Sequence, residues 1–316
     1  MERKIKTVLI GTSLTEMSDP VVRAGLAVAR AAGAQVMLVH AFQPQVVYGG
    51  GAPYVPEVFL EESIDAERAV VERRMTEQIA RLGIREEELA GRRVEFGAPH
   101  RILTETAATA AADLVVVGSA ESPRMAKVFG STADRVVRKS LRPVLVVRGP
   151  LEMPPERVLL PVDLSPVSAE AFRRGLDLLG ELSPSPDLRL EALYVVTGHD
   201  PGLLGPGEAR EGEEARDLDR FVTRNSFRSP HKVETRVGHG EVEDVIRARS
   251  AEWDADLIVL GTHGRGGFER FLLGSVASDV VRRGSTNVLV IPPVVEVGEV
   301  KPALRAEAVA SLLVFA

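Results

Sequence analysis

The sequence predicts an α/β protein built from two tandem, doubly wound open sheets of five parallel strands each, with helices on both faces. Three observations lead to this prediction: the chain repeats itself, short aliphatic runs alternate with amphipathic stretches of helical period, and the apolar residues are mostly aliphatic. Hydrophobic residues make up 45% of the 316 residues, whereas aromatic residues make up only 4%. This composition suits parallel strands buried on both faces, which are rich in Val, Ile and Leu.

The internal repeat divides the chain into two similar halves. The stretch at 7–26 matches 157–176 without a gap at an offset of 150, and the stretch at 112–140 matches 255–284 with a one-residue difference inside it. Each half is long enough to fold alone. Prolines interrupt both patterns near 148–158, which marks the junction. We therefore expect a first domain at 1–150, a second domain at 151–295 and a C-terminal tail at 296–316.

Within each half the elements alternate between strand and helix. Apolar residues at helical spacing, such as Val242, Val245 and Ile246, separate the aliphatic runs of the second half. Alternation of this kind predicts βαβ units around a parallel sheet, and right-handed crossovers wind that sheet in both directions. The strands expected in the second half lie at 157–162, 188–196, 232–237, 256–261 and 287–292.

Composition and charge narrow the classes of function. There is no cysteine, so thiol catalysis and disulfides are excluded. The net charge is −6 and aromatic residues are few, so the usual basic and stacking features of a nucleic-acid-binding protein are missing. No apolar run reaches the roughly 18 residues of a membrane span, and the apolar stretch at the start is too short for a signal peptide. We expect a cytoplasmic protein without nucleic-acid or membrane partners.

A glycine-rich stretch, GTHGRGGFERFLLGS at 261–275, leaves a predicted strand and opens a helix. Backbone amides without Cβ atoms can converge on an oxyanion, and the helix dipole favours negative charge there. Ser275 offers a hydroxyl, and Asp163, directly after the strand RVLLPV, can accept hydrogen bonds from a ribose or a base amine. Ligands of open α/β sheets bind at such strand ends, so the pattern favours a nucleotide. Two structural alternatives stay open: a simple surface turn, and a helix N-cap at Asp163.

Motifs of common nucleotide-dependent and hydrolytic enzymes are absent. The sequence contains no G-x-x-x-x-G-K-[ST], no G-x-G-x-x-G and no G-x-S-x-G. The six histidines show no metal-ligand spacing, and no convincing general base lies near the expected phosphates. We therefore favour a nucleotide-binding regulatory module. The alternatives are a slow ATPase or nucleotidyl-transfer enzyme that uses the same site, and an interaction scaffold without a ligand.

The pattern Gly261-x2-Gly264-x9-Gly274-Ser275, with Asp163 after the first strand, resembles the ATP-binding pattern of universal stress proteins. Both halves resemble that domain from end to end. The resemblance implies an adenine-nucleotide alpha-hydrolase-like fold, a role in the stress response, and ATP or another adenine nucleotide as ligand, with Mg²⁺ or Mn²⁺ as the candidate metal. It also implies pairing of the two domains within the chain, and leaves a homodimer of whole chains open. The site residues that it implies are Asp163 and Val195 on the adenosine side, Gly261 at the start of the loop, and Gly264, Arg265, Gly274, Ser275 and Val276 around the phosphates.

The first half departs from this pattern. Ser13 stands where the second half has Asp163, and Glu121 stands opposite Gly264 in a loop one residue shorter. A carboxylate facing a polyphosphate would repel it, so we expect one nucleotide per chain, in the second half. The alternative is that Glu121 turns to solvent and the first half still holds a phosphate.

The tail at 296–316 has no counterpart in the first half, and its end, 308–316, is apolar apart from one serine. This end is too short to cross a bilayer. Packing against the chain or a partner and simple fraying of a terminus are both open.

Overall fold

The elements of the two halves follow the same order along the chain. We describe them from a computed structural model, in which the described residues are 5–42, 57–119, 130–183, 187–198, 208–262 and 273–293. The tail at 296–316 lies outside these residues. None of the described helices is long and apolar enough to span a bilayer. The first half contains β1 (Thr7–Gly11), the 3-10 helix η1 (Glu16–Ser18), α1 (Asp19–Ala32), β2 (Gln35–Phe42), α2 (Glu57–Arg81), the 3-10 helix η2 (Glu86–Glu88), β3 (Leu89–Phe96), α3 (Pro99–Thr109), β4 (Leu114–Gly118), α4 (Ser131–Lys139) and β5 (Val144–Val147).

The second half repeats this order, and its strands agree closely with those expected from the sequence. The expected strand at 157–162 is found with these bounds, and the others differ from the expected bounds by one or two residues at their ends. The elements are β6 (Arg157–Val162), α5 (Pro166–Leu182), β7 (Arg189–Val196), α6 (Glu208–Asn225), β8 (Val233–His239), α7 (Val242–Glu252), β9 (Leu257–Gly261), α8 (Ser275–Arg283) and β10 (Asn287–Ile291).

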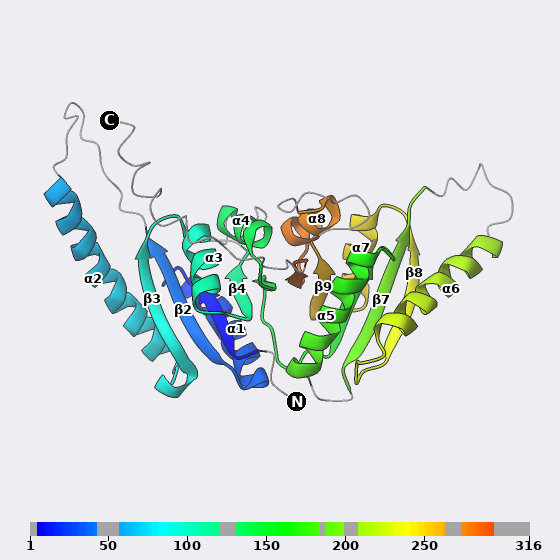
Figure 1. The fold of residues 1–316 in the computed structure, drawn as a ribbon, viewed down its shortest axis with the longest axis horizontal. Helices are drawn as coiled ribbons and strands as arrows, with labels where there is room; N and C mark the ends of the chain where they lie inside the picture. Colours follow the sequence, from blue (N-terminus) through cyan, green and yellow to red (C-terminus); the bar gives the residue numbers. More distant parts are fainter. Residues whose placement is uncertain are drawn as a thin grey trace, which may run out of the picture.

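The two five-stranded sheets are joined into one sheet of ten strands (Figure 1). The strand order is β3-β2-β1-β4-β5-β10-β9-β6-β7-β8, and all neighbours are parallel except β5 and β10, which pair antiparallel with Leu289 opposite Leu145. The predicted α/β class and the doubly wound parallel halves are confirmed. The fusion of the two sheets is an addition to the prediction. Every residue of β5 and β10 is buried, so an unpaired edge here would expose both apolar side chains and backbone polar groups.

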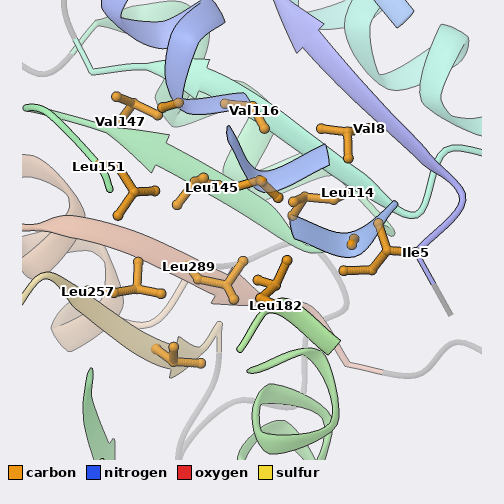
Figure 2. Close-up of a cluster of buried hydrophobic side chains, with 14 of the residues drawn as sticks. Ile5, Val8, Leu114, Val116, Leu145, Val147, Leu151, Leu182, Leu257 and Leu289 are labelled. Atoms are coloured by element: carbon orange, nitrogen blue, oxygen red, sulfur yellow. The ribbon is translucent and has the colours of Figure 1, made fainter. Parts of the chain in front are cut away.

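Helices cover both faces of the sheet, and each face has its own apolar layer. Residues of α1 and α5 pack on one face in a cluster that runs through both halves. Residues of α3, α4, α7 and α8 pack in a second cluster on the other face. At the junction, Leu145, Leu257 and Leu289 lie beside Leu182 of α5, so side chains from both halves share one core (Figure 2). The two halves therefore form one packed unit.

A repeated aspartate fixes the first strand of each half. The Asp113 carboxylate accepts hydrogen bonds from the backbone N–H groups of Lys6 (2.7 Å) and Thr7 (3.0 Å). In the second half, Asp256 accepts from Glu156 (2.9 Å) and Arg157 (2.8 Å). The repeated sequence Ala-Asp-Leu before β4 and β9 thus satisfies the backbone donors at the start of the neighbouring strand.

Candidate functional site

The strand order reverses between β6 and β9 in the second half, and two predicted site residues lie at that reversal. The two strands are parallel neighbours, with Leu159 of β6 opposite Ile258 of β9. Asp163 follows the last residue of β6, and Gly261 is the last residue of β9. Because parallel strands end at the same edge of a sheet, Asp163 and the loop after Gly261 leave the sheet next to each other. In open α/β sheets, this is where ligands bind.

Asp163 shapes the turn that leads into α5. Its Oδ1 accepts a hydrogen bond from the N–H of Ser165 at 2.9 Å, and the residue between them, Leu164, is left-handed with φ 64°. The N-cap of α5 is Ser165, whose Oγ accepts from the N–H of Ser168 at 3.1 Å. The alternative that Asp163 is the N-cap of this helix is therefore wrong. Asp163 is half-buried at the end of the strand, and its carboxylate stabilises the turn into α5.

The glycine-rich loop is closed at its base by two backbone hydrogen bonds. Thr262 N–H donates to the carbonyl of Ile291 at 3.2 Å, and Gly274 N–H donates to the carbonyl of Thr262 at 2.8 Å. Gly274 is the N-cap of α8, and Ser275 and Val276 are its first two residues. Helix geometry leaves the first N–H groups of α8 without acceptors inside the helix. The amides that can meet an anion here are those of Ser275 and Val276, because the Gly274 amide is already used.

The remaining predicted residues are Val195, Gly264 and Arg265. Val195 is the penultimate residue of β7, pairs with Gly238 of β8, and is half-buried on the α7 side of the sheet. It lies one strand away from β6, at the same end. Gly264 and Arg265 lie outside the described residues, as does His263. The structure thus brings Asp163, Gly261, Gly274, Ser275, Val276 and Val195 to the carboxyl edge of three adjacent strands, β9, β6 and β7.

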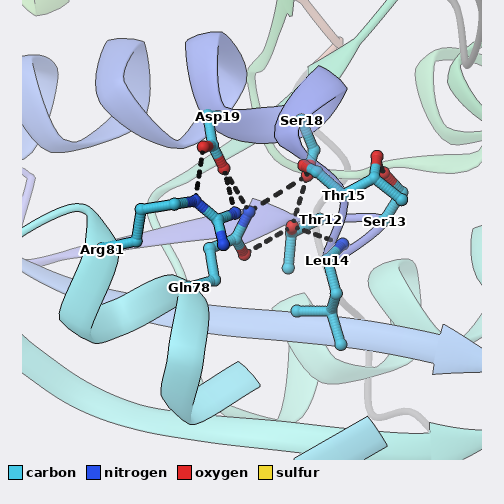
Figure 3. A network of polar contacts seen from close by, with 8 residues as sticks. All are labelled: Thr12, Ser13, Leu14, Thr15, Ser18, Asp19, Gln78 and Arg81. Atoms are coloured by element: carbon cyan, nitrogen blue, oxygen red, sulfur yellow. Dashed lines mark hydrogen bonds and ion pairs between the residues drawn. The ribbon is translucent and has the colours of Figure 1, made fainter. Parts of the chain in front are cut away.

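The equivalent edge of the first half carries a different polar network (Figure 3). Thr12 follows β1, and its hydroxyl donates to Oε1 of Gln78 at 2.8 Å. The Gln78 amide in turn donates to Ser18 Oγ (3.1 Å) and to Asp19 Oδ1 (2.8 Å). Asp19 also accepts two hydrogen bonds from Arg81, which hold the pKa of this carboxyl below its usual range. The network ties the end of β1 and the start of α1 to α2.

Ser13, which replaces the carboxylate of the second half, belongs to the same turn. Its Oγ lies 2.9 Å from Thr15 Oγ1, and the next residue, Leu14, is left-handed with φ 62°. The main-chain turn is thus kept in both halves, whereas the side chain that faces the strand end differs. Glu121, the other departure from the pattern, lies outside the described residues.

A cavity of about 330 Å³ opens at this edge of the first half. Its volume lies at the small end of the 300–1,000 Å³ range of small-molecule sites. Residues of β1, β2, α1, α3, β4 and α4 line it, and the switch point between β1 and β4 lies at its floor. The sequence did not predict a cavity in this half. The apolar part of its lining consists mainly of Met17, Val21, Val39, Leu103 and Val117.

Among the described residues that line this cavity, His40 is the titratable one. Its Nδ1 lies 2.8 Å from the carbonyl oxygen of Thr12, which can only accept, so Nδ1 carries the proton and Nε2 is an acceptor. Burial lowers the pKa of His40, and the positive charge of Arg74 acts in the same direction. The imidazole is therefore neutral at pH 7.

Gln78, Thr12 and the cavity residues were missed by sequence reasoning. Gln78 lies about 60 residues from the residues it contacts, and nothing in the local sequence distinguishes it from the other polar residues of α2. His40, at the end of an apolar run, was the available signal. Among the described residues, no group of three or more His, Asp or Glu side chains could hold a metal ion.

Comparison with known proteins gives a consistent result over nearly the whole chain. The sequence model of the universal stress protein family matches residues 4–148 and 155–292. A universal stress protein of Mycolicibacterium smegmatis is 31% identical over 307 residues, which cover 90% of this chain and 97% of that protein. A universal stress protein of Methanocaldococcus jannaschii is 32% identical over 145 residues, covering 43% of this chain and 81% of that protein.

Solved structures show the same fold over both halves. The crystal structure of a universal stress protein from Archaeoglobus fulgidus superposes with a TM-score of 0.61 at 18% identity, covering 91% of this chain and 96% of that chain. At this level of identity the likeness concerns the fold alone.

Proposed function

This chain belongs to the universal stress protein family, and from that premise we propose that it is a regulatory module of the stress response that binds an adenine nucleotide. The site lies in the second domain, for which we propose the bounds 151–295. One observation carries the proposal: Asp163 and the loop between Gly261 and Gly274 end adjacent parallel strands at the point where strand order reverses.

Polar and apolar groups at this edge suit the two ends of a nucleotide. The phosphates lie over the first turn of α8, where the amides of Ser275 and Val276 and the helix dipole favour an anion. Gly261, Gly264, Arg265 and Gly274 belong to the loop that surrounds them. The adenosine lies toward β6 and β7, where Asp163 accepts from the ribose and Val195 contacts the base.

The proposal is tested at Gly274 because its backbone accepts other residues. With φ −55° and ψ 155°, Gly274 has a conformation open to any L-residue, so Gly274→Val adds bulk without backbone strain. The added side chain stands beside the amides of the first turn of α8. We expect ATP affinity, measured by titration calorimetry, to fall at least about tenfold, which is about 1.4 kcal/mol. The melting temperature should change little.

Gly130→Val is the matched control in the first half. Gly130 is the N-cap of α4, with φ −61° and ψ 136°, and its N–H donates to the carbonyl of Ser119 as Gly274 donates to Thr262. This variant should leave ATP affinity unchanged. An unchanged affinity in folded Gly274→Val, or an equal loss in Gly130→Val, rejects the site.

Two further measurements separate binder, enzyme and scaffold. Nucleotide that copurifies with the chain and is released on denaturation, identified by mass spectrometry, distinguishes a binder from a scaffold. Formation of ADP from ATP with Mg²⁺ or Mn²⁺ distinguishes an enzyme from a binder. We expect bound adenine nucleotide and, at most, slow turnover.

A further inference from the structure

Among the described residues, the lining of the first-half cavity is uncharged. Its polar side chains there are Thr12, Ser13, Ser18, His40 and Thr132, none of which is ionised at neutral pH. The other described lining residues are apolar or contribute backbone. Burial of an apolar group here is favourable at roughly 25 cal/mol per Å². The cavity body therefore suits an apolar group of small-molecule size.

Three of the four described hydroxyl side chains in this lining, those of Thr12, Ser13 and Ser18, already form hydrogen bonds within the chain. Thr12 donates to Gln78 and accepts from the N–H of Leu14 at 3.0 Å. Ser18 Oγ donates to the carbonyl of Thr15 and accepts from Gln78. Ser13 pairs with Thr15 and provides no carboxylate. Rearranging this network to bind a nucleoside would leave buried polar groups unpaired, which is unfavourable.

Positive charge gathers on the two helices that begin at this cavity. Pro99 at the start of α3 and Thr132 at the start of α4 line the cavity, so two helix N-termini meet there. Arg135 lies one turn beyond Thr132, and Lys139 ends α4. In the part of the chain that the structure describes, neither Arg135 nor Lys139 forms an ion pair. Both side chains are exposed.

His100 is exposed to the positive potential of these cations. Burial lowers the pKa of His100, and the positive charges of Lys139, Arg135 and Arg101 lower it further. Arg101 has one acidic partner, Glu105, at 3.7 Å. Among the described residues, the charged side chains that act on His100, next to Pro99 of the cavity lining, are thus cationic.

The second half has the opposite charge at the equivalent positions. Where the first half has His100, Arg101 and Arg135, the second half has Glu243, Asp244 and Asp279. Asp279 is paired with Arg247 (3.0 Å) and Arg283 (3.1 Å), and Asp244 is paired with Arg247. The unpaired cations are therefore not a general requirement of this helix pair, because the same fold is built in the second half with balanced charge.

We propose that the first-half cavity binds a small organic anion with an apolar body, such as an aromatic carboxylate, and that it does not bind adenine nucleotides. The apolar body occupies the cavity, and the anionic group lies toward the N-termini of α3 and α4 and the cations on these helices. His40 Nε2 accepts a hydrogen bond from a donor on the ligand, where one is present. The chain then carries two different binding sites, one in each half. This inference does not depend on nucleotide binding by the second half.

The test uses the full chain and three probes: 2-naphthoate, its neutral analogue 2-naphthamide, and ATP. Binding is followed by saturation-transfer NMR titration of the two naphthalene probes. We expect one saturable site for 2-naphthoate, affinity for 2-naphthamide lower by several-fold, and no displacement of 2-naphthoate by ATP. Equal binding of both probes, displacement by ATP or the absence of saturable binding would overturn the proposal.

Variants locate the site. Arg135→Asp changes the charge by two units at an exposed position one helical turn from Thr132. For a separation of about 8 Å, even the dielectric of bulk water, about 80, gives a loss of naphthoate affinity of at least about fivefold. Lys232→Asp makes the same charge change beside β8, at the far end of the sheet, and should have no effect. Equal effects of the two variants would contradict a local site.

A cavity-filling variant gives an independent readout. Val21→Phe adds volume inside the cavity and should abolish naphthoate binding. Gly274→Val, which disables the proposed nucleotide site, should leave naphthoate binding unchanged. Naphthoate affinity that survives Val21→Phe in a folded protein would place the probe elsewhere. If Val21→Phe does not fold, Arg135→Asp still decides the proposal.

Discussion

Replacing Gly25 with alanine is expected to destabilise the first half, although glycine is a poor helix residue. Gly25 lies inside α1 and faces Ile10 of β1, which is fully buried. A Cβ at this position would lie 2.3 Å from Ile10 Cδ1 and 2.7 Å from Ile10 Cγ1. Carbon atoms pack at about 3.5–4.0 Å, so α1 or Ile10 must move by about 1 Å. The start of α1 lines the first-half cavity, which this shift would disturb.

The size of the effect follows from two opposing terms. Overpacking of a buried site costs about 1–3 kcal/mol, whereas alanine is better than glycine in a helix by about 1 kcal/mol. With the closest contact at 2.3 Å, the upper part of the overpacking range applies. We expect a net loss of about 1–2 kcal/mol in the free energy of unfolding. Gly212→Ala, in α6 with nothing within 4 Å of the added Cβ, should instead stabilise by up to about 1 kcal/mol.

Urea denaturation followed by circular dichroism at 222 nm measures both variants. A double-mutant cycle with Ile10→Val then tests the contact itself. Ile10→Val alone should cost about 0.5–1.5 kcal/mol, but it removes the Cδ1 atom and should cost little in the Gly25→Ala background. If Gly25→Ala stabilises the protein as Gly212→Ala does, or if the two effects simply add, the packing argument is wrong.

Three further predictions concern ion pairs and the junction of the halves. Hydrogen bonds from Arg side chains lower the pKa of Glu88 to about 2 from 4.5, so its stabilisation is complete above pH 4.5 and is lost as pH falls toward 2. Glu88→Gln should weaken the dependence of the free energy of unfolding on pH between 4.5 and about 2. Glu87→Gln, at an exposed neighbouring position, should leave this dependence unchanged. Leu289→Ala, at the shared core of the two halves, should lower the free energy of unfolding by about 2–5 kcal/mol in urea, and a loss below about 1 would contradict its placement. Glu191→Met removes the buried carboxylate that pairs with Arg249 and Arg236, and leaves Arg249 only its ion pair with the exposed Glu252. It should cost up to about 3–5 kcal/mol, of which Arg249→Thr in the same chain should recover part, and no recovery would argue against the pair.

Most of the fold could be predicted from the sequence because the aliphatic runs coincide with the strands of the structure. The run RVLLPV, which lies between Glu156 and Asp163, has the bounds of β6. The end of β8 was predicted at residue 237, two residues too early. A glycine within a strand pattern, here Gly238, usually indicates an interruption of the strand. In the structure Gly238 pairs with Val195, and a Cβ there would lie 2.6 Å from Val245 Cγ1. Close packing by α7, which no local pattern reveals, explains this glycine.

The parts that could not be predicted depend on contacts between distant segments. Apolar strands such as β5 and β10 indicate burial, but they do not specify that they bury each other. The first-half network needs Gln78 to meet Thr12 and Ser18 across about 60 residues. The candidate site of the second half was predictable as a pattern of residue types at strand ends. The sequence could not show that the Gly274 N–H donates to the Thr262 carbonyl. It therefore could not show that the amides of Ser275 and Val276 are the ones left for an anion.

Titration calorimetry of the full chain with ATP tests the central claim most directly. We predict one nucleotide per chain, and loss of that site when Asp163→Ala and Gly274→Val are combined. The first half should contribute no nucleotide site. Ser13 stands there in place of Asp163, and the hydroxyls of Ser13, Thr12 and Ser18 already form hydrogen bonds within the chain. Two equivalent sites per chain, or a single site that survives both substitutions, would contradict the assignment of nucleotide binding to the second half.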